Sequence, residues 1–209
     1  MYKLYWRQRT GSFAPAAVMA ELEIPYEAIL LEKDGKNAAV LHEQNPMAQI
    51  PLLILPDGSA MTKSGAISLY LAETRPDSGL ALRTDDPLRP HFLRWLSFVQ
   101  VNLYETVLRY YYNERYTSDP AGAPGVRQAA AERIERLWDM VAEEIQGPFF
   151  FGNRFTVLDI YLAMLAAWHS DPSALYGRLP KVGALVEATV ARPATGKVWH
   201  DYSMHKRTD

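Results

Sequence analysis

The chain has 209 residues, of which 48% are hydrophobic and 22% charged, and its formal net charge is −2. These values are those of an ordinary globular protein with a substantial core, and the charge gives no basis for binding nucleic acid or an anionic membrane surface. Cysteine is absent, which excludes disulfides, thiolate metal sites and a cysteine nucleophile, and no apolar run approaches the ~20 residues that span a bilayer.

The first 78 residues predict a small α/β domain. In chain order, the expected elements are a strand at 3–6, a helix at 13–23, a strand at 26–31, a hairpin of strands at 51–55 and 59–62, and a helix at 64–74. Pro56-Asp57-Gly58 supplies the hairpin turn, because proline presets φ and glycine accepts a positive φ. A β-α-β unit followed by a β-β-α unit is the thioredoxin-like arrangement, a mixed sheet flanked by helices.

Pro51 is expected at the first residue of its strand, because a proline cannot donate a hydrogen bond to the sheet ladder. Cis bonds are the minority state of X–Pro peptides. The spacing alone therefore predicts a trans Ile50–Pro51 bond.

After a linker at residues 75–79 that is rich in helix breakers, every expected element is helical. The pattern predicts a long helix over 86–115, a loop at 117–125, an amphipathic helix at 126–146 and a buried central helix within 152–168. Thr156 and Asp159 have the spacing of a capping box at the start of the central helix. We therefore expect two domains, residues 1–78 and an all-helical bundle at 86–209.

Segment 45–72 carries a set of spaced motifs. They are Asn45-Pro46, Ile50-Pro51, Asp57-Gly58 and a run that begins Ser64-x-Ala66-Ile67. Together they resemble the glutathione-binding half of the cytosolic glutathione S-transferase family, in its bacterial, serine-type form. The Thr156–Asp159 box and Arg192-Pro193 resemble the family's C-terminal half. The resemblance implies a thioredoxin-like N-terminal domain, a C-terminal helical bundle, a cis bond before Pro51 and a homodimer.

The same resemblance implies a set of residues that bind glutathione. Ser64 would bind the γ-glutamyl carboxylate, and the backbone of Ile50, between Gln49 and Pro51, would pair with the cysteinyl residue of the peptide. Lys36, with Lys33 as the alternative, would bind the glycyl carboxylate. Solvated loop residues are the plainer interpretation of both lysines.

Lys63 departs from the family pattern. Members usually have Glu, Asp or Gln immediately before the serine, where it faces the γ-glutamyl ammonium. A lysine would repel that ammonium unless it turned to solvent or bound the neighbouring carboxylate.

A glutathione transferase must also stabilise the thiolate of its co-substrate, since free thiols have a pKa near ~8.5. Ser12, between the first strand and the first helix, most resembles the serine of serine-type members, and Thr10 and Tyr5 are the alternatives. A simple helix N-cap is the competing interpretation of Ser12. Cysteine-type members have their cysteine at this turn, where Gly11 or Ser12 stands here, so glutathionyl-reductase chemistry is not expected.

Tyr104 and Tyr111 lie seven residues apart on one helix face and could line a pocket for a hydrophobic electrophile, although core or dimer packing is the plainer interpretation. The function expected from the resemblance is conjugation of glutathione to such an electrophile. The alternatives are a non-catalytic binding or scaffold protein and a glutathione-dependent isomerase, lyase or dehalogenase. The five histidines have no metal-ligand spacing, so we predict no metal, and residues 1–12 lack the apolar core of a signal peptide, which favours the cytoplasm.

Overall fold

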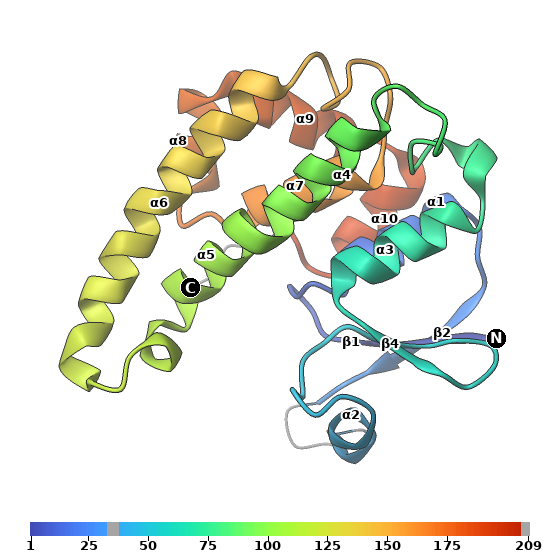
Figure 1. The fold of residues 1–209 in the computed structure, drawn as a ribbon, viewed down its shortest axis with the longest axis horizontal. Helices are drawn as coiled ribbons and strands as arrows, with labels where there is room; N and C mark the ends of the chain where they lie inside the picture. Colours follow the sequence, from blue (N-terminus) through green and yellow to red (C-terminus); the bar gives the residue numbers. More distant parts are fainter. Residues whose placement is uncertain (33–37, 206–209) are drawn as a thin grey trace.

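The computed structural model describes residues 1–32 and 38–205, and its N-terminal part is a mixed sheet flanked by helices (Figure 1). The strands are β1 (Tyr2–Trp6), β2 (Tyr26–Leu30), β3 (Leu52–Ile54) and β4 (Ala60–Thr62). The helices are α1 (Phe13–Glu21), α2 (Ala38–Gln44) and α3 (Ser64–Glu73). Within the described residues the strand order is β2-β1-β3-β4, with β1 and β2 parallel and the other pairs antiparallel. The predicted thioredoxin-like order is confirmed.

Helices cover both faces of this sheet, with α1 and α3 on one side and α2 on the other (Figure 1). Side chains alternate between the two faces along β1, because successive residues of a strand point to opposite sides. Leu4 therefore joins the main core beside α1, whereas Tyr5 joins a small core with Leu41 of α2.

The C-terminal part has no strand among the described residues and consists of helices, with two isolated β-bridges in the loop at 149–154. Its main helices are α4 (Arg89–Phe98), α5 (Glu105–Tyr111), α6 (Ala123–Glu144), α7 (Val157–Ala167), α8 (Pro172–Arg178), α9 (Pro180–Val190) and α10 (Pro193–Asp201). Short 3₁₀ turns are η1 (Pro76–Ser78), η3 (Asn113–Tyr116) and η4 (Pro120–Gly122). No helix among the described residues is both long and apolar enough to cross a membrane. The bounds 1–78 and 86–209 stay a prediction.

Two details of the helical part differ from expectation. The long helix expected over 86–115 is interrupted by a π-helical segment, η2 (Val99–Tyr104), between α4 and α5. The segment expected as a loop over 117–125 contains η4 and the first turn of α6. Proline is tolerated in the first turn of a helix, and Pro124 occupies that place in α6.

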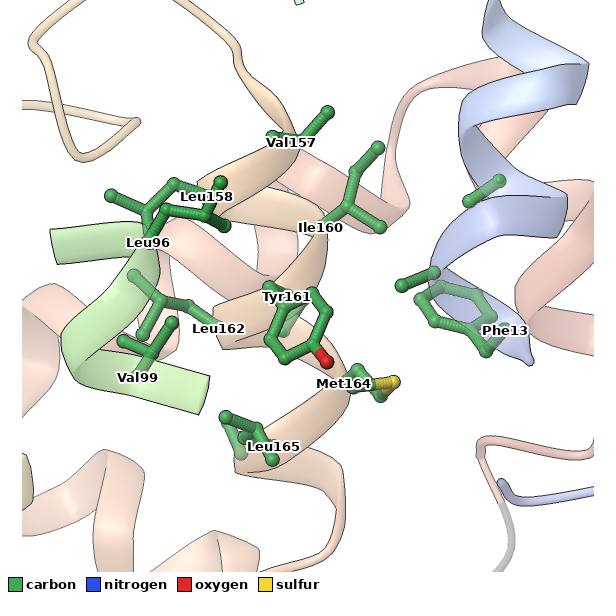
Figure 2. Close-up of a cluster of buried hydrophobic side chains, with 14 of the residues drawn as sticks. Phe13, Leu96, Val99, Val157, Leu158, Ile160, Tyr161, Leu162, Met164 and Leu165 are labelled. Carbon is green, nitrogen blue, oxygen red and sulfur yellow. The ribbon is translucent and has the colours of Figure 1, made fainter. Parts of the chain in front are cut away.

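Helix α7 is the centre of the helical domain, as its apolar sequence predicts. All eleven of its residues are buried. Figure 2 shows its side chains lying between Leu96 and Val99 on one side and Phe13 of α1 on the other. The predicted capping box is present: the Asp159 carboxylate accepts from the Thr156 amide, and the Thr156 hydroxyl oxygen accepts from the Leu158 amide.

The Ile50–Pro51 peptide bond is cis. The trans bond expected from spacing alone is therefore wrong, and the bond implied by the family resemblance is confirmed.

The end of the chain folds back onto its beginning. Helix α10 packs on α1, and the residue after it, Tyr202, stacks its ring 4.3 Å from that of Trp6. The Tyr202 carbonyl oxygen also accepts a hydrogen bond of 3.1 Å from the Arg9 amide. Residues near the C-terminus of the chain thus contact the turn between β1 and α1 and help to fix its position.

Candidate functional site

Three segments of the N-terminal domain meet at Gly11, in the turn between β1 and α1. A Cβ atom at position 11 would lie 3.3 Å from the Ser64 Oγ and 3.6 Å from the Pro51 Cδ. The turn, the cis-proline and the start of α3 therefore converge on one point. Because glycine has no side chain, these three segments can approach one another closely.

The π-helical segment η2 closes this point from the helical domain. The hydroxyl oxygen of Tyr104 lies 2.8 Å from the position of a Gly11 Cβ. Gln100, one turn earlier, covers the start of α3, since a Cβ at Gly65 would overlap its side chain. The sequence interpretation offered Tyr104 either core or dimer packing or an electrophile pocket, and gave Gln100 no role. Contacts between residues so far apart in the chain have no local sequence signal.

The Tyr104 ring is held between two aromatic side chains. Its centroid lies 6.2 Å from that of Tyr161, edge to face, and 5.5 Å from that of Trp168. Tyr111 is anchored in the same region, because its hydroxyl donates to the Trp168 carbonyl oxygen at 2.8 Å. Tyr104 and Tyr111 thus both meet the end of α7, and their role in an electrophile pocket stays a prediction.

Ser64 has a partner that the sequence interpretation missed. Its hydroxyl lies 2.5 Å from that of Tyr161, and the two residues are 4% and 1% exposed. Burial raises the pKa of Tyr161 above its ordinary value, so its hydroxyl stays protonated and can donate. The signal was a tyrosine inside an otherwise apolar central helix, since a buried tyrosine hydroxyl needs a hydrogen-bond partner.

Ser12 and Thr10 form a closed hydrogen-bond network with the Arg7 carbonyl oxygen. The Thr10 hydroxyl lies 2.9 Å from that carbonyl and 2.7 Å from the Ser12 hydroxyl, which is itself 3.2 Å from the carbonyl. Ser12 is fully buried and stands at the N-cap of α1, yet its side chain makes no capping bond. The hydroxyl therefore fixes the turn rather than the helix end. Its role toward a thiol stays a prediction, as does that of Tyr5, which packs toward α2.

Lys63 is exposed, and its ammonium group contacts two neighbouring side chains. Its Nζ donates to the Gln49 Oε1 at 3.0 Å and lies 3.5 Å from the Met47 Sδ. Lys63 also has a positive φ of 70° at the N-cap of α3. The predicted Lys36 and its alternative Lys33 lie outside the described residues.

A cavity of about 560 Å³ lies elsewhere, where the end of α7 meets helices α8 to α10. Trp199, Met204 and Tyr176 are among the residues that line it, and none of the predicted site residues does. Among the described residues no three histidine, aspartate or glutamate side chains gather in a way that could hold a metal ion.

A thioredoxin-like sheet with a cis-proline at the start of an inner strand, docked on an all-helical domain, defines the class of protein to which this chain is similar. Residues 15–79 match the family model described as "Glutathione S-transferase, N-terminal domain". Beyond that match, the chain is similar to glutathione S-transferases along almost its whole length.

Two relatives from Escherichia coli and one solved structure illustrate the similarity. The "Uncharacterized GST-like protein YncG" of strain K12 is 26% identical over 95% of this chain and 97% of its own. The "Glutathione S-transferase GstA" of strain O157:H7 is 24% identical over 91% of this chain and 94% of its own. A sphingomonad glutathione S-transferase solved in complex with glutathione is 26% identical, with a TM-score of 0.79 over 96% of this chain and 98% of that one.

Proposed function

We propose that the protein is a cytoplasmic glutathione transferase that conjugates the thiolate of glutathione to a hydrophobic electrophile. The observation that carries this proposal is the convergence of Gly11, Pro51 and Ser64 on one point beneath the Tyr104 hydroxyl. The sphingomonad relative, whose structure was solved in complex with glutathione, supports the choice of co-substrate.

The peptide is proposed to lie across the edge of the sheet. Ser64, at the N-terminus of α3, meets the γ-glutamyl carboxylate, where the helix end favours negative charge. The backbone of Ile50 pairs with the cysteinyl residue, and Lys36 meets the glycyl carboxylate. This places the cysteinyl sulfur beside Pro51 and Gly11, with the electrophile on the side of Tyr104 and Tyr111.

Two other functions remain as alternatives, and Lys63 is the observation that favours the first. A non-catalytic family member would keep the fold and lose affinity for glutathione, and a cation in place of the usual Glu, Asp or Gln is a way to lose it. A glutathione-dependent isomerase, lyase or dehalogenase would use the same thiolate as a transient nucleophile. Product analysis with candidate electrophiles separates these enzymes from a transferase, because only a transferase releases a stable conjugate.

Calorimetric titration of glutathione tests the proposed site at Lys63. Wild type is expected to bind glutathione, and Lys63→Glu to bind it about tenfold more tightly. The change replaces repulsion between Lys63 and the γ-glutamyl ammonium by attraction between a carboxylate and that ammonium, and a tenfold gain in affinity corresponds to ~1.4 kcal/mol. Arg136→Glu makes the same charge change on an exposed part of α6 and should leave affinity unchanged. Binding by Lys63→Glu alone would favour the non-catalytic reading, and binding by neither protein would contradict the glutathione site.

The proposed homodimer rests on an exposed apolar face of the helical domain. Leu93 of α4 and Val101 of the following segment η2 are 37% and 69% exposed. Val101→Asp is expected to convert the dimer to a monomer in sedimentation velocity at micromolar concentration. Met140→Asp, a matched change on the exposed face of α6, should leave the dimer intact. A wild-type monomer would contradict the proposal.

A further inference from the structure

We infer that Tyr104 donates the hydrogen bond that stabilises the glutathione thiolate, so that the activating hydroxyl comes from the helical domain and not from the turn between β1 and α1. This inference rests on the proposed function. It assigns the central step of the reaction to a residue for which sequence reasoning expected either core or dimer packing or pocket lining.

The first argument is position. The Tyr104 hydroxyl oxygen lies 2.8 Å from the place of a Gly11 Cβ, and that place is itself 3.6 Å from the Pro51 Cδ. A cysteinyl residue paired with the Ile50 backbone beside the cis-proline would bring its sulfur to this region. Sulfur bound beside this point would then lie next to the phenol, because Gly11 presents no side chain between them.

The second argument is that this hydroxyl is available. The Tyr104 hydroxyl makes no hydrogen bond to any residue that the structure describes, although the ring is packed against Tyr161 and Trp168. Burial raises the pKa of Tyr104 to about 12, and the nearby Tyr112 and Glu105 add to the rise. The phenol is therefore protonated at neutral pH and can donate its proton to a hydrogen bond.

The third argument is that the hydroxyls of the turn are already engaged. Thr10 and Ser12 have one hydroxyl proton each, and the Arg7 carbonyl and the other hydroxyl accept both. Using Ser12 as a donor to sulfur would break this buried network. The hydroxyl of Ser64 is buried, and it lies 2.5 Å from that of Tyr161.

The local backbone holds Tyr104 in this place. It is the last residue of the π-helical segment η2, and such segments are frequent at functional sites because the wider turn redirects side chains. One turn earlier in the same segment, Gln100 covers the start of α3. The segment thus presents two side chains to the site from one rigid element.

The chemical step balances with the groups named. The thiol proton passes to water as glutathione binds, and the phenol of Tyr104 keeps its own proton while donating a hydrogen bond to the sulfur anion. A sulfur lone pair then forms the C–S bond to the electrophilic carbon. The leaving group departs with the electron pair of the bond that breaks, or, in an addition, the adjacent carbon receives that pair and a proton from water.

Titration of bound glutathione by its thiolate absorbance near 240 nm tests the inference. In wild type the bound thiol is expected to ionise below the ~8.5 of a free thiol. Tyr104→Phe should raise that pKa by about one unit and lower kcat/KM at pH 7 roughly tenfold or more, with recovery at alkaline pH. Binding of S-methylglutathione, which has no thiol proton, should be unchanged. Tyr110→Phe, whose hydroxyl meets Arg127 on the surface, is the control.

The outcomes separate the inference from the function on which it rests. If wild type binds and conjugates glutathione but Tyr104→Phe leaves the thiol pKa unchanged, the inference is overturned and the transferase stands. If Ser12→Ala raised the pKa of the bound thiol and Tyr104→Phe did not, the inference would be overturned, and a hydroxyl of the turn between β1 and α1 would be the group that stabilises the thiolate. Failure of wild type to bind glutathione overturns both.

A second variant pair tests the same contact without depending on Tyr104→Phe alone. In wild type, Gly11→Ala places a methyl group 2.8 Å from the Tyr104 hydroxyl oxygen and must displace it. We expect Gly11→Ala to raise the bound thiol pKa as Tyr104→Phe does, and to add little further in the Tyr104→Phe background. Fully additive shifts would overturn the inference, because they would mean that the two residues act independently.

Discussion

Replacing Asp159 by alanine is expected to destabilise the protein by about 3–5 kcal/mol, since two buried backbone amides and a buried hydroxyl would lose their acceptor. Asp159 is fully buried. Its Oδ1 accepts from the Phe150 amide at 2.6 Å, and its Oδ2 accepts from the Thr156 amide at 2.8 Å and the Thr156 hydroxyl at 3.0 Å. One carboxylate therefore caps the central helix and ties it to the loop before it.

Urea unfolding at pH 7, with far-UV circular dichroism, measures this loss. Asp171→Ala is the matched control, because Asp171 caps the short, exposed helix α8 through one bond of 3.1 Å to the Ala174 amide. A helix N-cap of that kind is worth ~1 kcal/mol. Equal losses in the two variants would mean that the buried amides find other partners, and the central role of Asp159 would then be wrong.

Replacing Glu21 by glutamine is expected to cost about 2–3 kcal/mol at pH 7, because Arg192 would lose its carboxylate partner at the contact between α1 and α10. The Glu21 side chain is only 7% exposed. Its two carboxylate oxygens accept from the Arg192 guanidinium, at 2.6 Å in the shortest bond, and from the amide and hydroxyl of Thr195. This cluster joins the first helix of the chain to the last one in the structure.

The contacts of Glu21 also predict how the stability of the protein depends on pH. Burial alone would raise the pKa of Glu21, but hydrogen bonds from Arg192 and Thr195, together with the Arg192 charge, outweigh it and hold the pKa below its ordinary value. The unfolded chain then binds this proton more readily than the folded protein. Glu21 therefore makes its full contribution to the free energy of unfolding at pH values above its pKa in the unfolded chain. That contribution is lost as the pH falls through its pKa in the folded protein.

Unfolding free energies between pH 7 and pH 3 test this dependence. Wild type should lose more stability over that interval than Glu21→Gln, which cannot titrate at this position. Glu27→Gln removes an exposed pair with Lys3 and should change stability by less than ~1 kcal/mol at every pH. Parallel curves for wild type and Glu21→Gln would contradict the assignment.

The fold could be predicted from the sequence because its signals are local. Prolines and glycines mark the ends of the elements, and the periodicity of apolar residues gives their type. The π-helical segment at 99–104 could not be predicted in this way, since its apolar pattern continues that of the helices beside it. The cis bond at Pro51 needed the family resemblance, because spacing does not report the state of a peptide bond.

The candidate site could be predicted only in part, for the same reason. Ser64 and Pro51 belong to one contiguous motif that the sequence displays directly, and their roles toward glutathione stay a prediction. The pairing of Ser64 with Tyr161 joins residues 97 positions apart, and the approach of Tyr104 to Gly11 depends on how two domains dock. Such contacts follow from packing and leave no mark on the neighbouring sequence. The network of Thr10 and Ser12 is local, but hydroxyl residues in a turn have many equivalent partners.

The hydrogen bond from the Arg9 amide to the Tyr202 carbonyl has a consequence for how the protein is made. A ribosome delivers the turn that carries Gly11 among the first residues, and Tyr202 nearly two hundred residues later. Until Tyr202 emerges, the nascent N-terminal domain lacks this hydrogen bond to its turn. It also lacks the contacts of η2 until the middle of the chain has been translated. The proposed glutathione site is therefore completed late in synthesis, and a ligand that binds only the folded protein would favour the finished chain over any shorter intermediate.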